Sequence, residues 1–177
     1  ADQVSSSDRT PSAGDLLGWA AFGEARYGDV NSAAKYAKAS NEIHPNAMAD
    51  IAAGIISMQA GDRIEAMRHY AAAVKMKPDL AEAWNRLGTT LLVEEKFREA
   101  LPVLEQAVKL SPRDGAMHVD LAECLAKMLR GKLAAAQFKE AVRLEPDNIG
   151  FLSQYATAAA ITAQSETDYQ EAEQVLK

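Results

Sequence analysis

The chain has 177 residues, 48% of them hydrophobic, so it is long enough to bury the core of one domain. Its 25 Asp and Glu side chains outnumber its 19 Lys and Arg, and the formal charge of −6 disfavours binding to nucleic acid phosphates. No apolar run approaches the roughly 20 residues that a membrane-spanning helix needs.

Residues 1–13 are predicted to be a flexible leader outside the fold. The stretch ADQVSSSDRTPS at 1–12 is polar and has no hydrophobic periodicity. The start ADQ is what a signal peptidase would leave, which favours an exported or periplasmic protein and leaves a cytoplasmic one open. Cys124 is the single cysteine, so it forms no intramolecular disulfide, and we expect it to be a small core residue.

Beyond this leader, one hydrophobic pattern recurs at intervals of about 34 residues. Around the segment AEAWNRLG, residues 81–88, four side chains share one helix face: Trp84, Leu87, Gly88 and Leu91. One period later the same positions hold His118, Leu121, Ala122 and Leu125. Twelve residues after each small residue stands an alanine: Ala33, Ala66, Ala100 and Ala134. The pattern predicts an array of similar helical units.

Each unit is predicted to be a pair of antiparallel helices that ends at a proline. The prolines are Pro45, Pro78, Pro112 and Pro146. Because proline disfavours helix in the residue before it, each second helix should end there. The next helix should start directly after the proline, capped by a side-chain oxygen. The expected caps are Asn46, Asp79, Asp114, and Asp147 or Asn148. The predicted repeats are 14–46, 47–80, 81–114, 115–148 and 149–177, the last one incomplete.

Three details inside these units can also be predicted. A glycine inside a helix costs about 1 kcal/mol relative to alanine, so Gly88 is expected where paired helices nearly touch, opposite Ala100. Pro102 is tolerated in a second helix if that helix begins at Phe97 or the next residue. In the last repeat the matching alanine is Ala172, four residues late, which predicts a longer loop between its helices.

These spacings resemble those of the tetratricopeptide repeat family, and residues 81–114 match its pattern best. The resemblance covers 14–177, with a degenerate first repeat. It implies an all-α fold, a right-handed α-solenoid of antiparallel helix pairs in about five units, the last with a longer loop. It also implies a non-enzymatic module that binds a peptide or helix of a partner protein along a concave wall formed by the first helix of each unit.

That concave wall gives two sets of candidate ligand-binding residues on this chain. The apolar set is Phe22, Ile51, Ile55 and Met58, and the polar set is Asn85, Arg86, Thr89 and Glu123. An apolar patch with a polar rim is typical of a binding site, although the same residues could pack within a degenerate repeat. Two arrangements known in the family are missing: the clamp for acidic chaperone tails and the asparagine ladder of a sugar-transferring member. The ladder positions here hold Trp19, Ala52, Arg86, Asp120 and Gln154.

No constellation for catalysis, a metal ion or a cofactor stands out. His44, His69 and His118 occupy different positions in their units, and His118 is expected simply to pack. The alanine-rich composition resembles bacterial members of the family that serve in envelope assembly, secretion or polysaccharide export. Two alternatives stay open: self-association through the solenoid ends into a homo-oligomer, and a regulatory segment of a larger enzyme.

Overall fold

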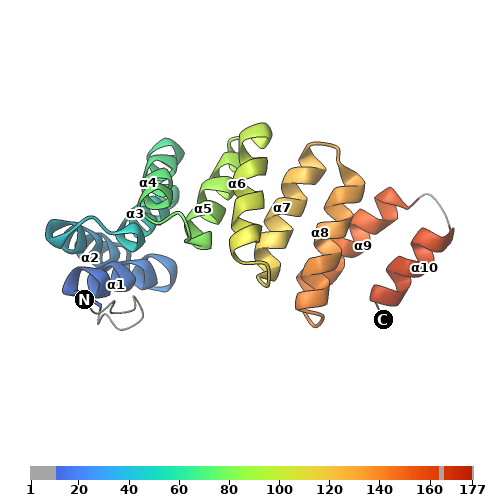
Figure 1. Cartoon of the computed structure of the whole chain (residues 1–177), viewed down its shortest axis with the longest axis horizontal. Coiled ribbons are helices and arrows are strands. Elements are labelled where there is room, and N and C mark those ends of the chain that lie inside the picture. Colours follow the sequence, from blue (N-terminus) through green and yellow to red (C-terminus); the bar gives the residue numbers. More distant parts are fainter. Residues whose placement is uncertain (1–10, 164–165, 177) are drawn as a thin grey trace, which may run out of the picture. The chain divides into compact units, whose positions relative to one another are not determined.

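The computed structural model describes residues 11–163 and 166–176. Every regular element within these residues is an α-helix, and the helices follow one another in pairs (Figure 1). The pairs are α1 (Ala13–Tyr27) with α2 (Val30–Ile43), α3 (Ala47–Gln59) with α4 (Arg63–Met76), α5 (Ala81–Val93) with α6 (Phe97–Leu110), α7 (Gly115–Lys127) with α8 (Gly131–Leu144), and α9 (Ile149–Thr162) with α10 (Glu166–Val175). The predicted all-α array of helix pairs is therefore confirmed.

The chain divides into two compact units, which we call unit 1 (residues 1–78) and unit 2 (residues 79–177). In unit 1, α3 packs against α1, α2 and α4. In unit 2, each helix from α5 to α10 contacts the next one along the chain. Nothing in the repeat pattern predicted a division at this point, because a proline ends each of the first four repeats in the same way.

Small residues set the distance between the paired helices. A Cβ atom on Gly88 would lie 2.5 Å from Leu104 Cδ2, so α5 and α6 can approach this closely only with glycine at that position. Gly54 on α3 is placed in the same way against the ring of Tyr70 on α4. The predicted close approach at Gly88 is confirmed, but the residue opposite it is Leu104, one turn after Ala100.

Three of the four predicted helix caps are confirmed. Asn46 caps α3, Asp114 caps α7 and Asn148 caps α9, each through a side-chain oxygen. The prediction for Asp79 was wrong, because α5 begins only at Ala81 and the residue in the capping position is Leu80, which has no side-chain acceptor.

The two ends of the described chain differ in detail from the prediction. The leader is shorter, since Ser12 already caps α1, while residues 1–10 lie outside the described residues. The loop expected to be longer includes 164–165, which also lie outside them. Ala172 is the seventh residue of α10, whereas the matching Ala134 is the fourth of α8.

Four other sequence predictions can be compared with the described residues. Helix α6 begins at Phe97 and continues through Pro102, as expected. Cys124 is fully buried, and His118 is 6% exposed and hydrogen-bonded to Gln137, so both belong to the packing as predicted. None of the described helices is long and apolar enough to cross a membrane.

Candidate functional site

The apolar set of predicted ligand residues does not form one open surface. Ile51 is 0% and Ile55 7% exposed, because α3 is packed against three other helices of unit 1. Phe22 and Met58 are half-buried. The prediction that Ile51 and Ile55 supply accessible groove area is therefore wrong, and these two residues belong to the core.

A row of aromatic side chains, two exposed and one half-buried, lies instead on α1. Trp19 is 54% exposed, and its ring meets Phe22 edge to face with the centroids 6.2 Å apart. The guanidinium of Arg26 lies 5.9 Å from the Phe22 centroid and 5.2 Å from that of Tyr27, within the range of a cation–π contact. The row gives unit 1 an accessible aromatic surface next to a cation.

A cleft of about 440 Å³ opens beside Trp19 in unit 1. The lining comes from α1 and the residue two before it, the turn between α2 and α3, the start of α3, and the end of α4 with the residue after it: Pro11, Asp15, Trp19, Pro45, Asn46, Ala47, Met48, Met76 and Lys77. Met48 is almost fully buried, whereas Met76 is 39% exposed at the edge. The cleft thus combines apolar surface with one acidic and one basic side chain.

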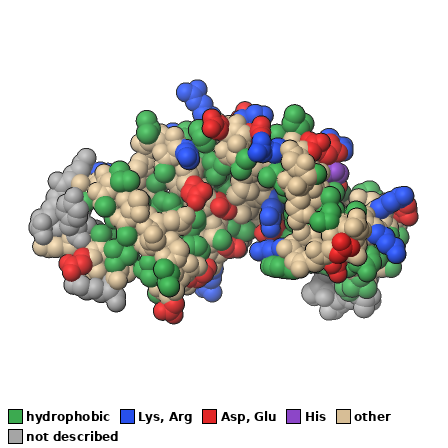
Figure 2. Space-filling model, turned by 180° about the vertical axis from the view of Figure 1, so that it is seen from behind, with side chains coloured by type: hydrophobic (Ala, Val, Ile, Leu, Met, Phe, Trp, Pro, Cys, Tyr) green, Lys and Arg blue, Asp and Glu red, His purple; other side chains and the backbone are tan. Residues whose placement is uncertain are grey.

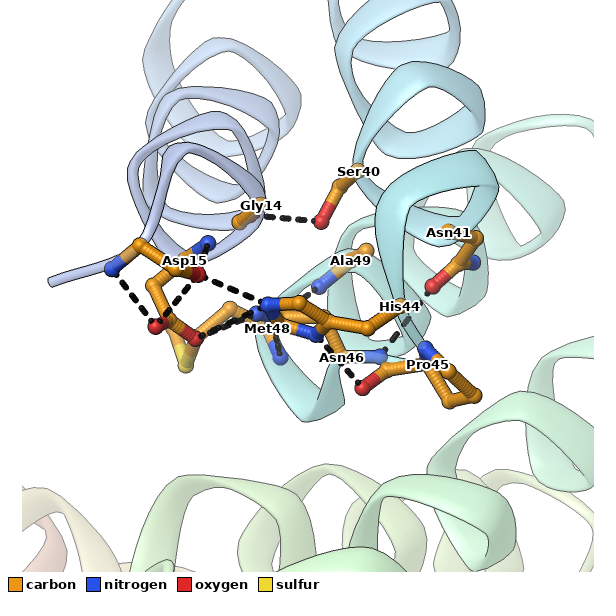
Figure 3. A network of polar contacts seen from close by, with 10 residues as sticks. Gly14, Asp15, Ser40, Asn41, His44, Pro45, Asn46, Met48 and Ala49 are labelled. Atoms are coloured by element: carbon orange, nitrogen blue, oxygen red, sulfur yellow. Dashed lines mark hydrogen bonds and ion pairs between the residues drawn. The ribbon is translucent and has the colours of Figure 1, made fainter.

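Asn46 and Asp15 form the polar wall of this cleft (Figure 3). Asn46 Oδ1 accepts hydrogen bonds from the backbone N–H groups of Met48 at 2.8 Å and Ala49 at 3.3 Å, and its Nδ2 donates to Asp15 Oδ1 at 3.0 Å. The other Asp15 oxygen accepts from the hydroxyl and the backbone N–H of Ser12. These Ser12 hydrogen bonds lower the pKa of Asp15, so its carboxylate is ionised at neutral pH.

Two glycines of α1 make room for this wall. A Cβ on Gly14 would lie 2.7 Å from His44 Nε2, and one on Gly18 would overlap the side chain of Asn46. His44 Nε2 is also 2.7 Å from Ser12 Oγ, and Ser40 Oγ donates to the Gly14 carbonyl at 2.7 Å (Figure 3). The turn after α2 is therefore held to α1 by direct polar contacts, which fixes this side of the cleft.

The polar set of predicted ligand residues lies in unit 2, where hydrogen bonds join its first helices. Asn85 on α5 donates from Nδ2 to Asp120 Oδ2 on α7 at 2.8 Å. Gln154 on α9 donates from Nε2 to Glu123 Oε1 on α7 at 3.1 Å. Glu123 is exposed, and the other three side chains are half-buried. We call these four residues the polar row.

The remaining two polar candidates are engaged with their own helix. Thr89 Oγ1 donates to the backbone carbonyl of Asn85 at 3.0 Å, as a threonine inside a helix often does. Arg86 Nε donates to Glu82 Oε1 at 2.9 Å, one turn earlier. Both residues therefore support the structure of α5 more than they present free groups to a ligand.

Asp120 is the most perturbed ionisable group of the polar row. Burial raises its pKa to about 6, partly offset by the hydrogen bond from Asn85 and reinforced by the charge of Glu123. Asn85 Oδ1 is buried and meets no hydrogen-bond donor within the described residues. The hydrogen-bonding groups of Asn85 and Asp120 are therefore only partly satisfied when Asp120 is ionised.

Sequence reasoning did not select Trp19, Asp120 or Gln154 as site residues. All three occupy the same position in their repeats, and the other two repeats hold Ala52 and Arg86 there. A tryptophan, a carboxylate and an amide at one repeated position were the signal for a position whose chemistry varies between repeats. On the face shown in Figure 2, hydrophobic side chains are interspersed with acidic and basic ones.

Comparison with known proteins identifies the repeat. The tetratricopeptide repeat profile matches residues 85–149. A stretch of 88 residues, 49% of the chain, is 36% identical to 14% of the peroxisomal targeting signal receptor of Saccharomyces cerevisiae. A stretch of 112 residues, 62% of the chain, is 27% identical to 23% of DnaJ homolog subfamily C member 7 of Homo sapiens.

Solved structures share the fold of this chain. The structure of MamA 41-end from Desulfovibrio magneticus RS-1 has a TM-score of 0.73 at 21% identity, with 95% of this chain and 96% of that chain covered. A MamA structure denoted MSR-1 has a TM-score of 0.68 at 17% identity, with 91% of each chain covered. The chain is a tetratricopeptide repeat protein.

The likeness to the MamA structures concerns the fold alone, and the chain spans less than a quarter of the two curated relatives. Tetratricopeptide repeats stack into extended surfaces that bind other proteins. By class, the chain is thus a protein-interaction scaffold.

Proposed function

We propose that this tetratricopeptide repeat protein holds a peptide or helix of a partner protein on the side formed by the first helices of its units. The observation that carries the proposal is the exposed Trp19 beside the cleft of unit 1. The volume of about 440 Å³ falls in the range of roughly 300 to 1,000 Å³ that ligand sites occupy.

Trp19 has the properties of an anchor for such a partner. Tryptophan is enriched among the residues that dominate protein interfaces, because it buries a large area and loses little conformational freedom. Exposed Met76 and buried Met48 add flexible apolar surface on the other side of the cleft. A partner side chain that enters the cleft would therefore remove apolar surface of both proteins from water.

Charged groups of unit 1 would orient the bound segment. Asp15 is held in place by Ser12 and Asn46 and carries a negative charge at neutral pH. Lys77 lines the same cleft with the opposite charge. We therefore expect a partner segment with an apolar residue next to charged or polar ones.

The polar row supplies a second contact, within unit 2. The exposed carboxylate of Glu123 and the amide of Gln154 could hydrogen-bond with a partner's backbone or polar side chains. Asn85, Arg86 and Thr89 would act through the structure of α5. The proposal includes no catalytic step. It extends to a role in bacterial envelope assembly, secretion or polysaccharide export, which is supported only by the alanine-rich composition of the chain.

Selection of displayed peptides tests this proposal. A phage library of random 12-residue peptides is panned against the chain, and each enriched peptide is measured against Trp19→Ala. Tyr27→Ala is the matched control, since Tyr27 is an 81% exposed aromatic of the same helix that does not line the cleft. We expect affinity to fall at least 10-fold in Trp19→Ala and to stay unchanged in Tyr27→Ala.

A spectroscopic readout locates the contact. The chain has two tryptophans, so Trp84→Phe leaves Trp19 as the single reporter. Bound peptide should shift its emission to shorter wavelength, because the indole loses water contact. The proposal fails if enriched peptides bind Trp19→Ala as well as they bind the original chain, or if no peptide is enriched.

A further inference from the structure

The turn between α7 and α8 in unit 2 carries a leucine at its outermost point. Leu129 is 94% exposed, more than any other large hydrophobic side chain among the described residues. Leu133, in the first turn of α8, is 55% exposed. The turn lies at the upper edge of unit 2 in Figure 1. We call residues 127–133 the α7–α8 tip.

The backbone of Leu129 is strained as well. Its φ of 61° lies in the left-handed region, which side-chain-bearing residues avoid. Its N–H donates to the carbonyl of Ala126 at 2.9 Å, one of the hydrogen bonds that close a helix with a left-handed residue, usually glycine. The same position in earlier repeats holds Gly61 and Glu95. A leucine here costs backbone strain and exposes apolar surface to water, so local structure does not account for it.

The charges of the α7–α8 tip are all positive. Between Glu123 and Glu140 the sequence contains no acidic residue. Three basic residues of this stretch, Lys127, Arg130 and Lys132, are exposed. The last two stand at the start of α8, where carboxylates are favoured over cations. Positive charge thus surrounds two exposed leucines in a chain whose formal charge is −6.

The neighbouring turn of unit 2 does not cancel this charge. Between α5 and α6, the exposed carboxylates of Glu95 and Glu99 are matched by two exposed basic side chains, Lys96 and Arg98. The α7–α8 tip is therefore a local positive site at this edge of the unit.

The α7–α8 tip stands on a packed base. A Cβ atom on Gly131, the first residue of α8, would lie 2.7 Å from Thr162 Cγ2 at the end of α9. The start of α8 and the end of α9 are therefore in close contact. Ile161, the residue before Thr162, is 78% exposed at the same edge, so apolar surface continues beyond the two leucines.

The shape of the α7–α8 tip decides what it fits. Leu129 is hardly covered by its neighbours, so it projects from the molecule and lines no groove. A projecting apolar side chain needs an apolar layer to enter, and the cations around it need negative charge on several sides at once. A bilayer with anionic lipids offers both over its whole surface, since its headgroups attract basic residues and its acyl region accepts leucine.

We propose that the α7–α8 tip docks on the surface of a membrane that contains anionic lipids. Its two leucines enter the interface, and its three basic side chains contact the headgroup phosphates. Charge complementarity and the projecting leucine carry this choice of partner. The surface is separate from the Trp19 cleft, so the inference does not rest on the proposed function.

Binding to lipid vesicles tests the inference. The probe is a vesicle of phosphatidylcholine with an equal amount of phosphatidylglycerol, compared with a vesicle of phosphatidylcholine alone, and bound protein is measured by flotation. We expect the original chain to bind the anionic vesicles more strongly, and added salt to weaken this binding.

Leu129→Gly separates membrane contact from folding. It should lower the partition coefficient on anionic vesicles about 10-fold, because a leucine side chain is no longer buried in the interface. Its melting temperature should not fall, since glycine adopts the left-handed conformation without strain. The control is Ile149→Gly, which removes an 81% exposed apolar side chain at the opposite edge of unit 2 and should leave binding unchanged.

A second pair of variants tests the charges. Arg130→Gln with Lys132→Gln should weaken binding to anionic vesicles at least 10-fold. The control, Lys109→Gln with Arg113→Gln, removes the same charge from exposed positions at the opposite edge of unit 2 and should bind as the original chain does.

Four results would overturn the inference. The first is equal binding of the original chain to both kinds of vesicle, or none to either. The second is unchanged binding in Leu129→Gly, and the third is equal loss in both charge variants, which would mean a general charge effect. The fourth is binding of soluble polyglutamate that only the tip variants lose, without binding of vesicles, which would make the α7–α8 tip a contact for an acidic protein instead.

Discussion

The first helices of unit 1 and unit 2 carry different chemistry on equivalent positions of the repeat. In unit 1, Trp19 stands exposed beside a cleft. In unit 2 the same position holds Asp120 and Gln154, which are hydrogen-bonded to side chains of neighbouring first helices. The internal packing of the helix pairs does not differ in this way, since Gly54 and Gly88 each admit a large side chain of the paired helix.

This difference separates two roles of the repeat sequence. Small residues at fixed spacing determine how closely the paired helices pack, so they must be similar in both units. The register position of Trp19, Asp120 and Gln154 makes no such demand, and its side chain can be aromatic in one repeat and acidic in another. Binding chemistry can therefore vary along the chain without any change of fold.

The largest expected effect concerns the shared packing. Gly54→Val and Gly88→Val should each lower the free energy of unfolding by about 3 kcal/mol, because the added side chain would overlap Tyr70 or Leu104. Trp19 reports on unit 1 and Trp84 on unit 2, so each loss can be followed by tryptophan fluorescence during urea unfolding.

Gly23→Ala is the control for these glycine variants. A Cβ on Gly23 has no neighbour within 4 Å, so alanine there should stabilise α1 by about 0.5 to 1 kcal/mol through helix propensity alone. If the valine variants were as stable as the original chain, the close helix contacts described here would be wrong.

A smaller effect is expected from the polar row. The folded-state pKa of Asp120 is about 6, above the value of about 3.9 in an unfolded chain, so the folded state holds an extra proton between these pH values. The contribution of the Asp120 carboxyl group to the free energy of unfolding is fully present below pH 4 and is lost as the pH rises to 6 and above. Asp120→Asn should therefore be more stable than the original chain at pH 7.5 by about 2 to 3 kcal/mol.

The pH dependence of that difference is the decisive readout. Other carboxylates, such as Asp15 and Glu65, have lowered pKa values and change stability in the opposite direction, but they are common to both proteins. The advantage of Asp120→Asn should fall toward zero at pH 4. A difference that stays constant between pH 4 and 7.5 would contradict the buried position of this carboxylate.

The fold could be predicted from the sequence because the repeated residues are those that pack between paired helices. Spacings of small residues recur along the chain and prolines end the first four repeats, so the helix pairs and the role of Gly88 could be predicted. The candidate site was harder, because burial of Ile51 and Ile55 depends on three helices that pack around α3. The exposure of Trp19 and the pairing of Asn85 with Asp120 likewise depend on neighbours distant in sequence.

The smallest effect compares two capping asparagines at equivalent joints. Asn46 caps α3, is 7% exposed and also donates to Asp15, whereas Asn148 caps α9 at a more open position and donates to Glu145. Asn46→Ala should lower the free energy of unfolding by about 2 kcal/mol, because it removes both the cap and a hydrogen-bond partner of Asp15. Asn148→Ala should lower it by about 1 kcal/mol, which is close to the effect of losing a cap alone.

Chemical unfolding of both variants measures this comparison, and peptide binding extends it. Since Asn46 lines the cleft beside Trp19, its loss should also weaken peptides selected on that cleft, while Asn148→Ala should leave them unaffected. Equal costs for the two asparagines would show that the contact between Asn46 and Asp15 adds nothing to the cap. The polar wall in unit 1 would then be an ordinary helix start and not a positioned part of the cleft.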